Sequence, residues 1–108
     1  MDNQKSRLDL EHLSRQTMGD EALSRQVLSI FIDHVTQTMP QLEIASDDLA
    51  KLAHGLKGSA KGIGAWDVAG AAEALEKTEG NPADAIRCLK QAVDATVDEI
   101  GRYLAEVR

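Results

Sequence analysis

Apolar residues recur every three or four positions along this chain, which is the spacing of amphipathic α-helices. Asp9 can cap a short first helix, Gly19 marks its end, and Asp20 can cap a long second helix. Pro40 lies inside the second pattern, where its missing N–H predicts a kink rather than a stop, because the periodicity resumes after it. The apolar positions expected to face the core here are Leu10, Leu13, Met18, Leu23, Val27, Ile30, Phe31, Val35 and Leu42.

The second half of the chain continues the helical pattern after a polar break at Ser46-Asp47-Asp48, which supplies an N-cap. A central helix follows over residues 49–64, and Asp67 is expected to cap a fourth helix. Residues 80–82 are Gly-Asn-Pro, a pattern that predicts the boundary between two helices. The glycine is expected after the end of one helix, the asparagine as the N-cap of the last helix, and the proline at its first position. The apolar positions expected to face the core are Leu49, Leu52, Leu56, Ala60, Ile63, Val68, Ala71, Ala72, Leu75, Ile86, Leu89, Val93, Val97, Ile100, Leu104 and Val107.

No segment alternates apolar and polar residues with the period of two that strands show, so the sequence predicts an all-α fold. Short connections between the helices place sequential neighbours antiparallel. We therefore expect an up-down antiparallel four-helix bundle with a short additional N-terminal helix. The 108 residues suit a single domain over residues 1–108, in which the polar residues 1–7 are expected to be disordered.

The composition restricts the classes of function that such a fold can serve. A formal net charge of -6 argues against a nucleic-acid binder, which shows a basic surface. No apolar run approaches the roughly 18 residues of a membrane span, and the N-terminus lacks the apolar core of a signal peptide. The single cysteine, Cys88, excludes an internal disulfide, fits a reducing cytoplasm and is expected in or beside the packed layer. We expect a complete cytoplasmic chain that is a monomer, since one bundle accounts for every apolar stripe.

His54 is the most distinctive residue of the central helix because it lies opposite the apolar stripe. At about 100° per residue, the centre of the stripe formed by Leu52 and Leu56 lies almost opposite this histidine, so its ring is expected to face solvent. Lysines surround it on the helix although the chain is acidic overall: Lys51, Lys57 and Lys61.

Glycine is concentrated on the same helix, at positions 55, 58, 62 and 64. Each glycine inside a helix costs roughly 1 kcal/mol relative to alanine, so a gain elsewhere is expected. The usual gain is close approach of another group to the backbone. Gly55 and Gly62 can serve tight helix packing, whereas Gly58 lies on the face of His54.

The run from His54 to Ser59, HGLKGS, followed by Gly64, resembles the signature of histidine-containing phosphotransfer (HPt) domains. That signature is a histidine, any residue, a hydrophobic residue, lysine, glycine and a small residue, with a second glycine about ten positions after the histidine. The length of the chain and the order of its helices also fit, so the resemblance covers essentially the whole sequence.

The resemblance implies that His54 carries a phosphoryl group, and the residue types suit that chemistry. A neutral imidazole is a nucleophile that can accept a phosphoryl group on nitrogen. Lys57, one helical turn on, can stabilise phosphoryl charge, with Lys61 as a further helper. Gly58 removes a side chain beside the ring, where the acidic pocket and metal of a partner would dock.

The chain shows no nucleotide site of its own, since residues 55–64 lack the P-loop spacing and follow no strand. It also shows no carboxylate cluster to hold magnesium. The resemblance therefore implies a phosphoryl carrier of two-component phosphorelays, without kinase activity or a cofactor. Its partners would be receiver domains of response regulators or hybrid histidine kinases, which carry the aspartate and supply the magnesium.

Three points stay open. Some family members place a glutamine near the histidine, and the matching position here is Glu76, whose carboxylate can orient the ring. A non-catalytic helical adaptor would instead bind a partner through an exposed helix face and would tolerate loss of His54. A metal-binding bundle using His12, His34 and His54 is the third reading, although bundle ligands point inward and His54 points outward. Apart from that reading, His12 and His34 are expected to be ordinary surface residues.

Overall fold

Five α-helices make up the described part of the chain, which is residues 8–44 and 47–106 of a computed structural model. The helices are α1 (Leu10–Gln16), α2 (Glu21–Leu42), α3 (Leu49–Ile63), α4 (Trp66–Glu76) and α5 (Ala83–Glu106). No strand is present in these residues, as the sequence predicted. The predictions for residues 1–7, Ser46 and Val107 lie outside the described residues. No helix in the described ranges has the length and hydropathy needed to cross a bilayer.

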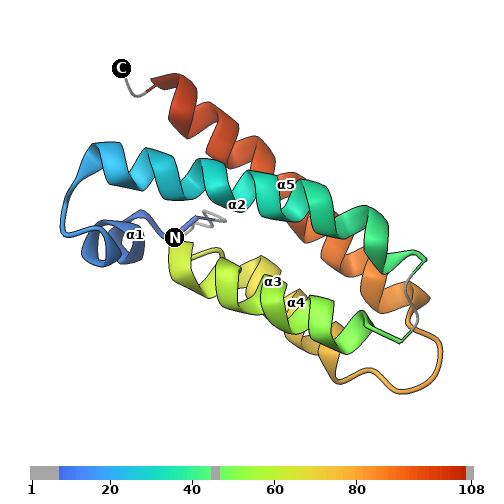
Figure 1. The fold of residues 1–108 in the computed structure, drawn as a ribbon. Coiled ribbons are helices and arrows are strands. Elements are labelled where there is room, and N and C mark those ends of the chain that lie inside the picture. The colour runs from blue at the N-terminus through green and yellow to red at the C-terminus, as the bar shows by residue number, and fades with distance from the viewer. Residues whose placement is uncertain (1–7, 45–46, 107–108) are drawn as a thin grey trace, which may run out of the picture.

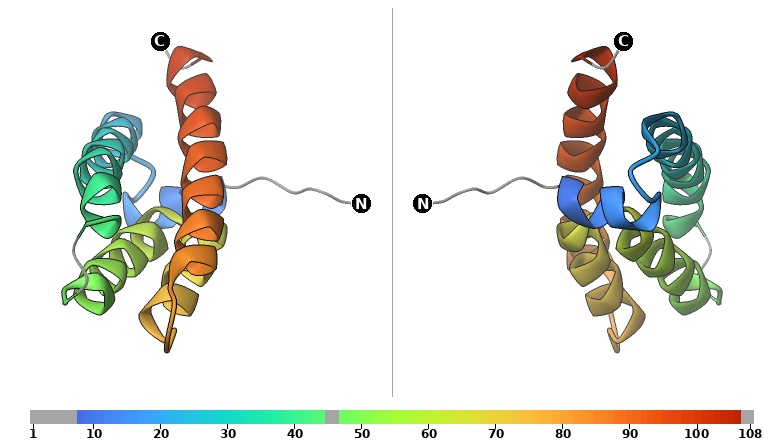
Figure 2. Two further views of the ribbon diagram at one scale, coloured as in Figure 1. Left: turned by 90° about the vertical axis from the view of Figure 1, so that its right-hand side faces the viewer. Right: turned by 90° about the vertical axis from the view of Figure 1, so that its left-hand side faces the viewer.

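The four longer helices pack against one another in chain order. The closest pair is α3 and α4; α2 packs on α3, α5 packs on α4, and α2 also contacts α5. In Figure 1 the ribbon reverses its direction at each connection from α2 to α5. Figure 2 shows the short helix α1 running crosswise to the others, and α1 contacts both α2 and α3. This arrangement leaves one side of α3 uncovered along its length.

Buried apolar side chains from all five helices form one core between these elements. The largest fully buried apolar side chains are Phe31, Leu8, Leu13, Leu28, Leu42, Leu56, Leu89, Ile100, Val35 and Val68. Burial of a large apolar side chain contributes about 1.5–3 kcal/mol, so these residues supply most of the driving force for folding.

The first two helices bury a different set of side chains than the pattern predicted. Leu10, Met18, Leu23 and Ile30 were expected in the core but are exposed. The buried row of α2 consists of Ser24, Leu28, Phe31, Val35, Thr38 and Leu42. A row centred on these positions leaves Leu23 and Ile30 on its flank, because each lies about 100° or more around the helix from the centre of the row.

The later helices follow the predicted stripes more closely, with local differences. In α3 the buried row includes Ala53, which was not predicted, while Leu49 and Leu52 are only half-buried. In α5 the predicted row is interrupted by Thr96, which is fully buried. Cys88 is exposed, so its predicted place beside the packed layer is wrong; its neighbour Leu89 takes the buried position.

The predicted helix starts are confirmed at two of four aspartates. The side chains of Asp9 and Asp20 each accept a backbone N–H three residues on, as N-caps do. Asp48 occupies the N-cap position of α3 but its side chain makes no capping hydrogen bond. The prediction for Asp67 is wrong, because α4 begins at Trp66 and its N-cap is Ala65, two residues before Asp67. Asp67 lies instead in the first turn, where a negative charge favours the helix dipole.

The predicted breaks between helices are close to the observed ones. α2 continues through Pro40 and ends two residues later, so the proline does not stop the helix. Asn81 accepts a hydrogen bond from the N–H of Ala83, and α5 begins at Ala83 rather than at Pro82. α3 ends at Ile63, and its C-cap Gly64 has a left-handed φ of 82°. A Cβ at Gly64 would lie only 2.9 Å from the backbone oxygen of Asp9, so glycine also allows α1 to approach α3.

Candidate functional site

His54 lies in the middle of α3 with its ring in solvent, as predicted, and its side chain is 68% exposed. Its Nδ1 is 3.0 Å from Oε2 of Glu76, the last residue of α4. An ionised carboxylate can only accept, so for a neutral ring we assign the proton to Nδ1. The lone pair then resides on Nε2, the other ring nitrogen.

Glu76 holds Lys57 as well as His54. Its Oε1 is 3.0 Å from Nζ of Lys57, and the two side chains are 26% and 19% exposed. The hydrogen bond from Lys57 is the main reason that the pKa of Glu76 is lowered; burial opposes this shift, and His54 adds to it. Glu76 is therefore ionised at neutral pH. The structure brings together two residues predicted on one helix, His54 and Lys57, with Glu76 from the next.

The three glycines inside α3 are not required for internal packing, unlike Gly64 at its C-cap. A Cβ at Gly58 would meet no atom within 4 Å, which agrees with its predicted open position on the His54 face. The same holds for Gly62, and a Cβ at Gly55 would reach only the ring of His34, at 4.0 Å. The predicted packing role of Gly55 and Gly62 is therefore wrong. Lys61 is exposed on the same side of the helix.

The other two histidines have structural partners that sequence reasoning missed. His34 of α2 forms a hydrogen bond between its Nδ1 and Oγ of Ser59, at 2.7 Å, and so joins α2 to α3. His12 of α1 lies with Nε2 2.8 Å from the carbonyl oxygen of Lys61. These contacts span 25 and 49 residues, and no local pattern in the sequence indicates them.

The contact of His12 is part of a cluster that attaches α1 to the α3–α4 turn. The ring of His12 packs edge-on against Trp66 with centroids 4.9 Å apart. Trp66 donates from Nε1 to Oδ2 of Asp9, at 2.9 Å, and Asp9 donates its backbone N–H to the carbonyl of Gly64. The Trp66 hydrogen bond is the main reason that the pKa of Asp9 is lowered. Asp9, His12, Lys61, Gly64 and Trp66 are called the α1 cluster below.

The metal-binding reading finds no support in the described residues. The three histidines contact different partners. No group of three His, Cys, Asp or Glu side chains that could hold a metal ion occurs in residues 8–44 and 47–106.

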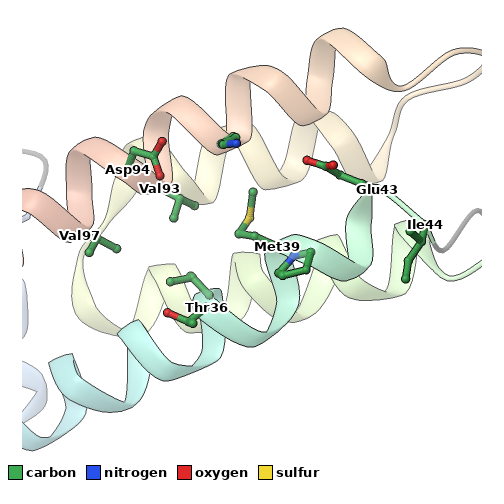
Figure 3. Close-up of a pocket in the computed structure, with 10 residues that line it drawn as sticks. Thr36, Met39, Glu43, Ile44, Val93, Asp94 and Val97 are labelled. Atoms are coloured by element: carbon green, nitrogen blue, oxygen red, sulfur yellow. The ribbon is translucent and has the colours of Figure 1, made fainter.

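Two of the hollows beside α2 have mainly apolar linings. A pocket of about 310 Å³ lies between α1, α2 and α3, and its lining includes the exposed Leu23 and Ile30 together with Ser59 and Gly62 of α3. A groove of about 570 Å³ lies between α2 and α5, where Figure 3 shows Met39, Val93 and Val97 between the two helices. The lining of the groove includes no residue of α3, so of these two hollows it is the first that adjoins the helix of His54.

Comparison with known proteins identifies the family of the chain. The family model of the Hpt domain matches residues 26–106, which leaves α1 and the first turn of α2 outside the match. The crystal structure of the histidine phosphotransferase ShpA from Caulobacter crescentus is similar over 94% of this chain and 93% of that chain, with a TM-score of 0.78 and 25% sequence identity. No curated relative matches. The chain therefore belongs to the Hpt domain family, whose members carry phosphoryl groups in phosphorelays rather than acting as kinases.

Proposed function

We propose that this chain is a histidine phosphotransfer protein that accepts a phosphoryl group on Nε2 of His54 and exchanges it with aspartates of receiver domains. The observation that carries the proposal is the exposed ring whose Nδ1 is held by Glu76 at 3.0 Å. That hydrogen bond leaves Nε2 as the nucleophile, and the exposure of the ring allows a donor to approach in line.

The transfer step needs only one bond made and one broken. Nε2 of His54 attacks the phosphorus of an aspartyl phosphate on the partner, the new N–P bond forms, and the O–P bond breaks. The electron pair leaves with the aspartate, which becomes a carboxylate again. The proton on Nδ1 stays in place, in its hydrogen bond to the carboxylate of Glu76. The reverse step returns the group to a receiver.

Lys57 assists by compensating the charge of the phosphoryl group. It lies one turn from His54 on α3, and its four-carbon side chain is flexible enough to move toward Nε2. Lys61, exposed on the same side, is a further helper. Magnesium belongs to the receiver in this proposal, so the chain itself requires no cofactor.

The partner is proposed to dock on the uncovered side of α3. Gly58 contributes no side chain there, and the adjoining pocket offers the apolar side chains of Leu23 and Ile30. The proposal includes an up-down antiparallel bundle, which is supported by the reversal of direction between consecutive helices (Figure 1). Such a bundle displays the middle of α3 on an outer face.

The test is transfer from a panel of phosphorylated receiver domains to the chain and to His54→Gln. We expect an acid-labile, base-stable label on the unsubstituted chain and none on His54→Gln. His34→Gln is the matched control, because it removes a partly exposed histidine of the adjacent helix and should keep the label. If folded protein takes no label from any receiver, or if His54→Gln is labelled equally, the proposal fails and the adaptor reading is preferred.

A further inference from the structure

Glu76 does more than orient the ring of His54, because its second oxygen holds the cation that the phosphoryl group needs. Oε1 lies 3.0 Å from Nζ of Lys57, while Oε2 lies 3.0 Å from Nδ1 of His54. We propose that Glu76 competes with the phosphoryl group for Lys57 and thereby limits how strongly the chain retains a phosphoryl group. This inference rests on the proposed function and concerns the regulation of the same site.

Glu76 lies on a helix rather than in a loop. It is the last residue of α4, the helix that packs most closely on α3. His54 and Lys57 stand one turn apart on α3, so a single carboxylate can reach both. The ion pair is mostly covered, with Lys57 19% exposed, whereas the ring of His54 is 68% exposed. Lys57 is therefore committed to Glu76 in the chain without a phosphoryl group.

Phosphorylation of His54 changes this balance. A phosphoryl group carries close to two negative charges, against one on the carboxylate, so Lys57 gains by moving toward it. The move breaks the contact between Lys57 and Glu76. The free energy of that contact therefore reduces the net stabilisation of the phosphoryl group by Lys57. Ion pairs with partly exposed partners have modest strength, so the subtraction corresponds to about a two- to fivefold change in the equilibrium constant for phosphorylation.

Glu73, one turn before Glu76 on α4, forms an ion pair with a different lysine. Glu73 lies 2.8 Å from Nζ of Lys77, and the hydrogen bond from Lys77 is the main reason that the pKa of Glu73 is lowered. Glu73 therefore supplies a matched control, since its hydrogen-bond partner is Lys77 and its interaction with Lys57 is a weaker Coulombic one without a contact.

Replacement of Glu76 by glutamine separates the two contacts. The amide oxygen of glutamine can still accept the hydrogen bond from Nδ1 of His54, but the neutral side chain no longer competes for Lys57. The resemblance noted in the sequence places a glutamine at this position in some family members. The carboxylate of this chain is thus expected to favour passing the phosphoryl group on rather than storing it.

The experiment measures retention without any receiver. The chain is equilibrated with phosphoramidate and ammonia, where the P–N bond of phosphoramidate breaks, the P–Nε2 bond forms and ammonia leaves. The loaded fraction is read by phosphorus NMR at several ratios of the two compounds. We expect Glu76→Gln to raise the equilibrium constant about two- to fivefold, Glu73→Gln to leave it unchanged, and Glu76→Gln to have no such effect when Lys57→Ala is also present.

The outcomes separate this inference from the proposed function. An unchanged or lower constant in Glu76→Gln overturns the inference. An increase that persists with Lys57→Ala also overturns it, because repulsion by Glu76 alone would then explain the effect. Failure of the proposed function has a different signature, in which the unsubstituted chain loads no more than His54→Gln whatever residue occupies position 76. Circular dichroism of each variant verifies that it is folded.

Discussion

Two clusters on α3 contain similar residue types but differ in how many of their polar groups have partners within the chain. Each has a histidine, a lysine, a glycine and a carboxylate. The carboxylate comes from the end of α4 in one cluster and from the N-cap of α1 in the other. The first, called the open site here, consists of His54, Lys57, Gly58 and Glu76. The second is the α1 cluster, which consists of Asp9, His12, Lys61, Gly64 and Trp66.

The α1 cluster is satisfied from within the chain. The ring of His12 contacts the carbonyl of Lys61, and the carboxylate of Asp9 accepts both the indole N–H of Trp66 and a backbone N–H. The space beside Gly64 is filled by Asp9. In the open site, by contrast, the ring of His54 projects into solvent and the space beside Gly58 is empty. Residue types alone do not distinguish a structural cluster from a functional one. The distinction depends on which groups stay accessible to another molecule.

The largest expected effect comes from filling the space beside Gly58. Gly58→Glu places a bulky anion where the acidic pocket of a receiver would dock, and clashes of this kind cost several kcal/mol. We expect the rate of phosphoryl transfer to fall about a hundredfold, which equals about 2.7 kcal/mol. Transfer is measured with the receiver that labels the unsubstituted chain.

The matched control for this substitution is Gly101→Glu. Gly101 is also an exposed helical glycine at which an added Cβ would meet no atom within 4 Å, but it lies on α5, which packs on α2 and α4. This variant should transfer at the normal rate. Full-rate transfer by folded Gly58→Glu would remove the distinction between the open site and the rest of the surface.

The second prediction compares alanine at the two glycines. Gly64→Ala should destabilise the fold by about 1–2 kcal/mol, because φ is 82° and a Cβ would lie 2.8 Å from Cβ of Asp9. Gly58→Ala should stabilise it by about 0.5–1 kcal/mol, because alanine suits a helix interior better than glycine. Chemical denaturation gives both values. Equal effects of the same sign would mean that the two glycines do not differ as the structure indicates.

The smallest effect concerns acid stability of the α1 cluster. The pKa of Asp9 is lowered by Trp66 and by the backbone N–H of His12, so the ionised carboxylate stabilises the folded state. Because the folded pKa lies below the unfolded one, this contribution is complete above about pH 4 and is lost as the pH falls through the folded pKa. Asp9→Asn should therefore lower stability at neutral pH, and the difference from the unsubstituted chain should shrink as the pH falls.

Urea unfolding at a series of pH values measures this difference. Glu76, whose pKa is also lowered, is present in both proteins and does not contribute to it. A difference that stays constant down to pH 3 would contradict the role assigned to the carboxylate of Asp9.

The sequence predicted what depends on residues close together in the chain. Helical periodicity located all five helices, and the exposure of His54 followed from its angle to the apolar stripe of one helix. Lys57 and Gly58 could be assigned to the same site because they lie within one turn or so of His54. Local spacing suffices wherever one helix determines the geometry.

What the sequence did not predict depends on contacts between helices. The buried row of α2 is set by neighbours on several sides, so Leu28 was missed while Ile30 was placed in the core. Glu76 was matched through the family resemblance, but its contact with Lys57 requires the packing of α3 on α4. The contact between His12 and Lys61 spans 49 residues and lies beyond any helical period.

The hydrogen bond between His54 and Glu76 connects residues 22 positions apart and exists only while the hairpin of α3 and α4 is closed. Nitrogen-15 resonances of an imidazole distinguish a protonated from an unprotonated ring nitrogen. The nitrogen resonances of the His54 ring therefore report whether the hairpin is closed, and the same ring is the proposed site of phosphorylation. When a binding partner, a mutation or heat shifts the end of α4, the nitrogen spectrum of one side chain should register the movement without any added label.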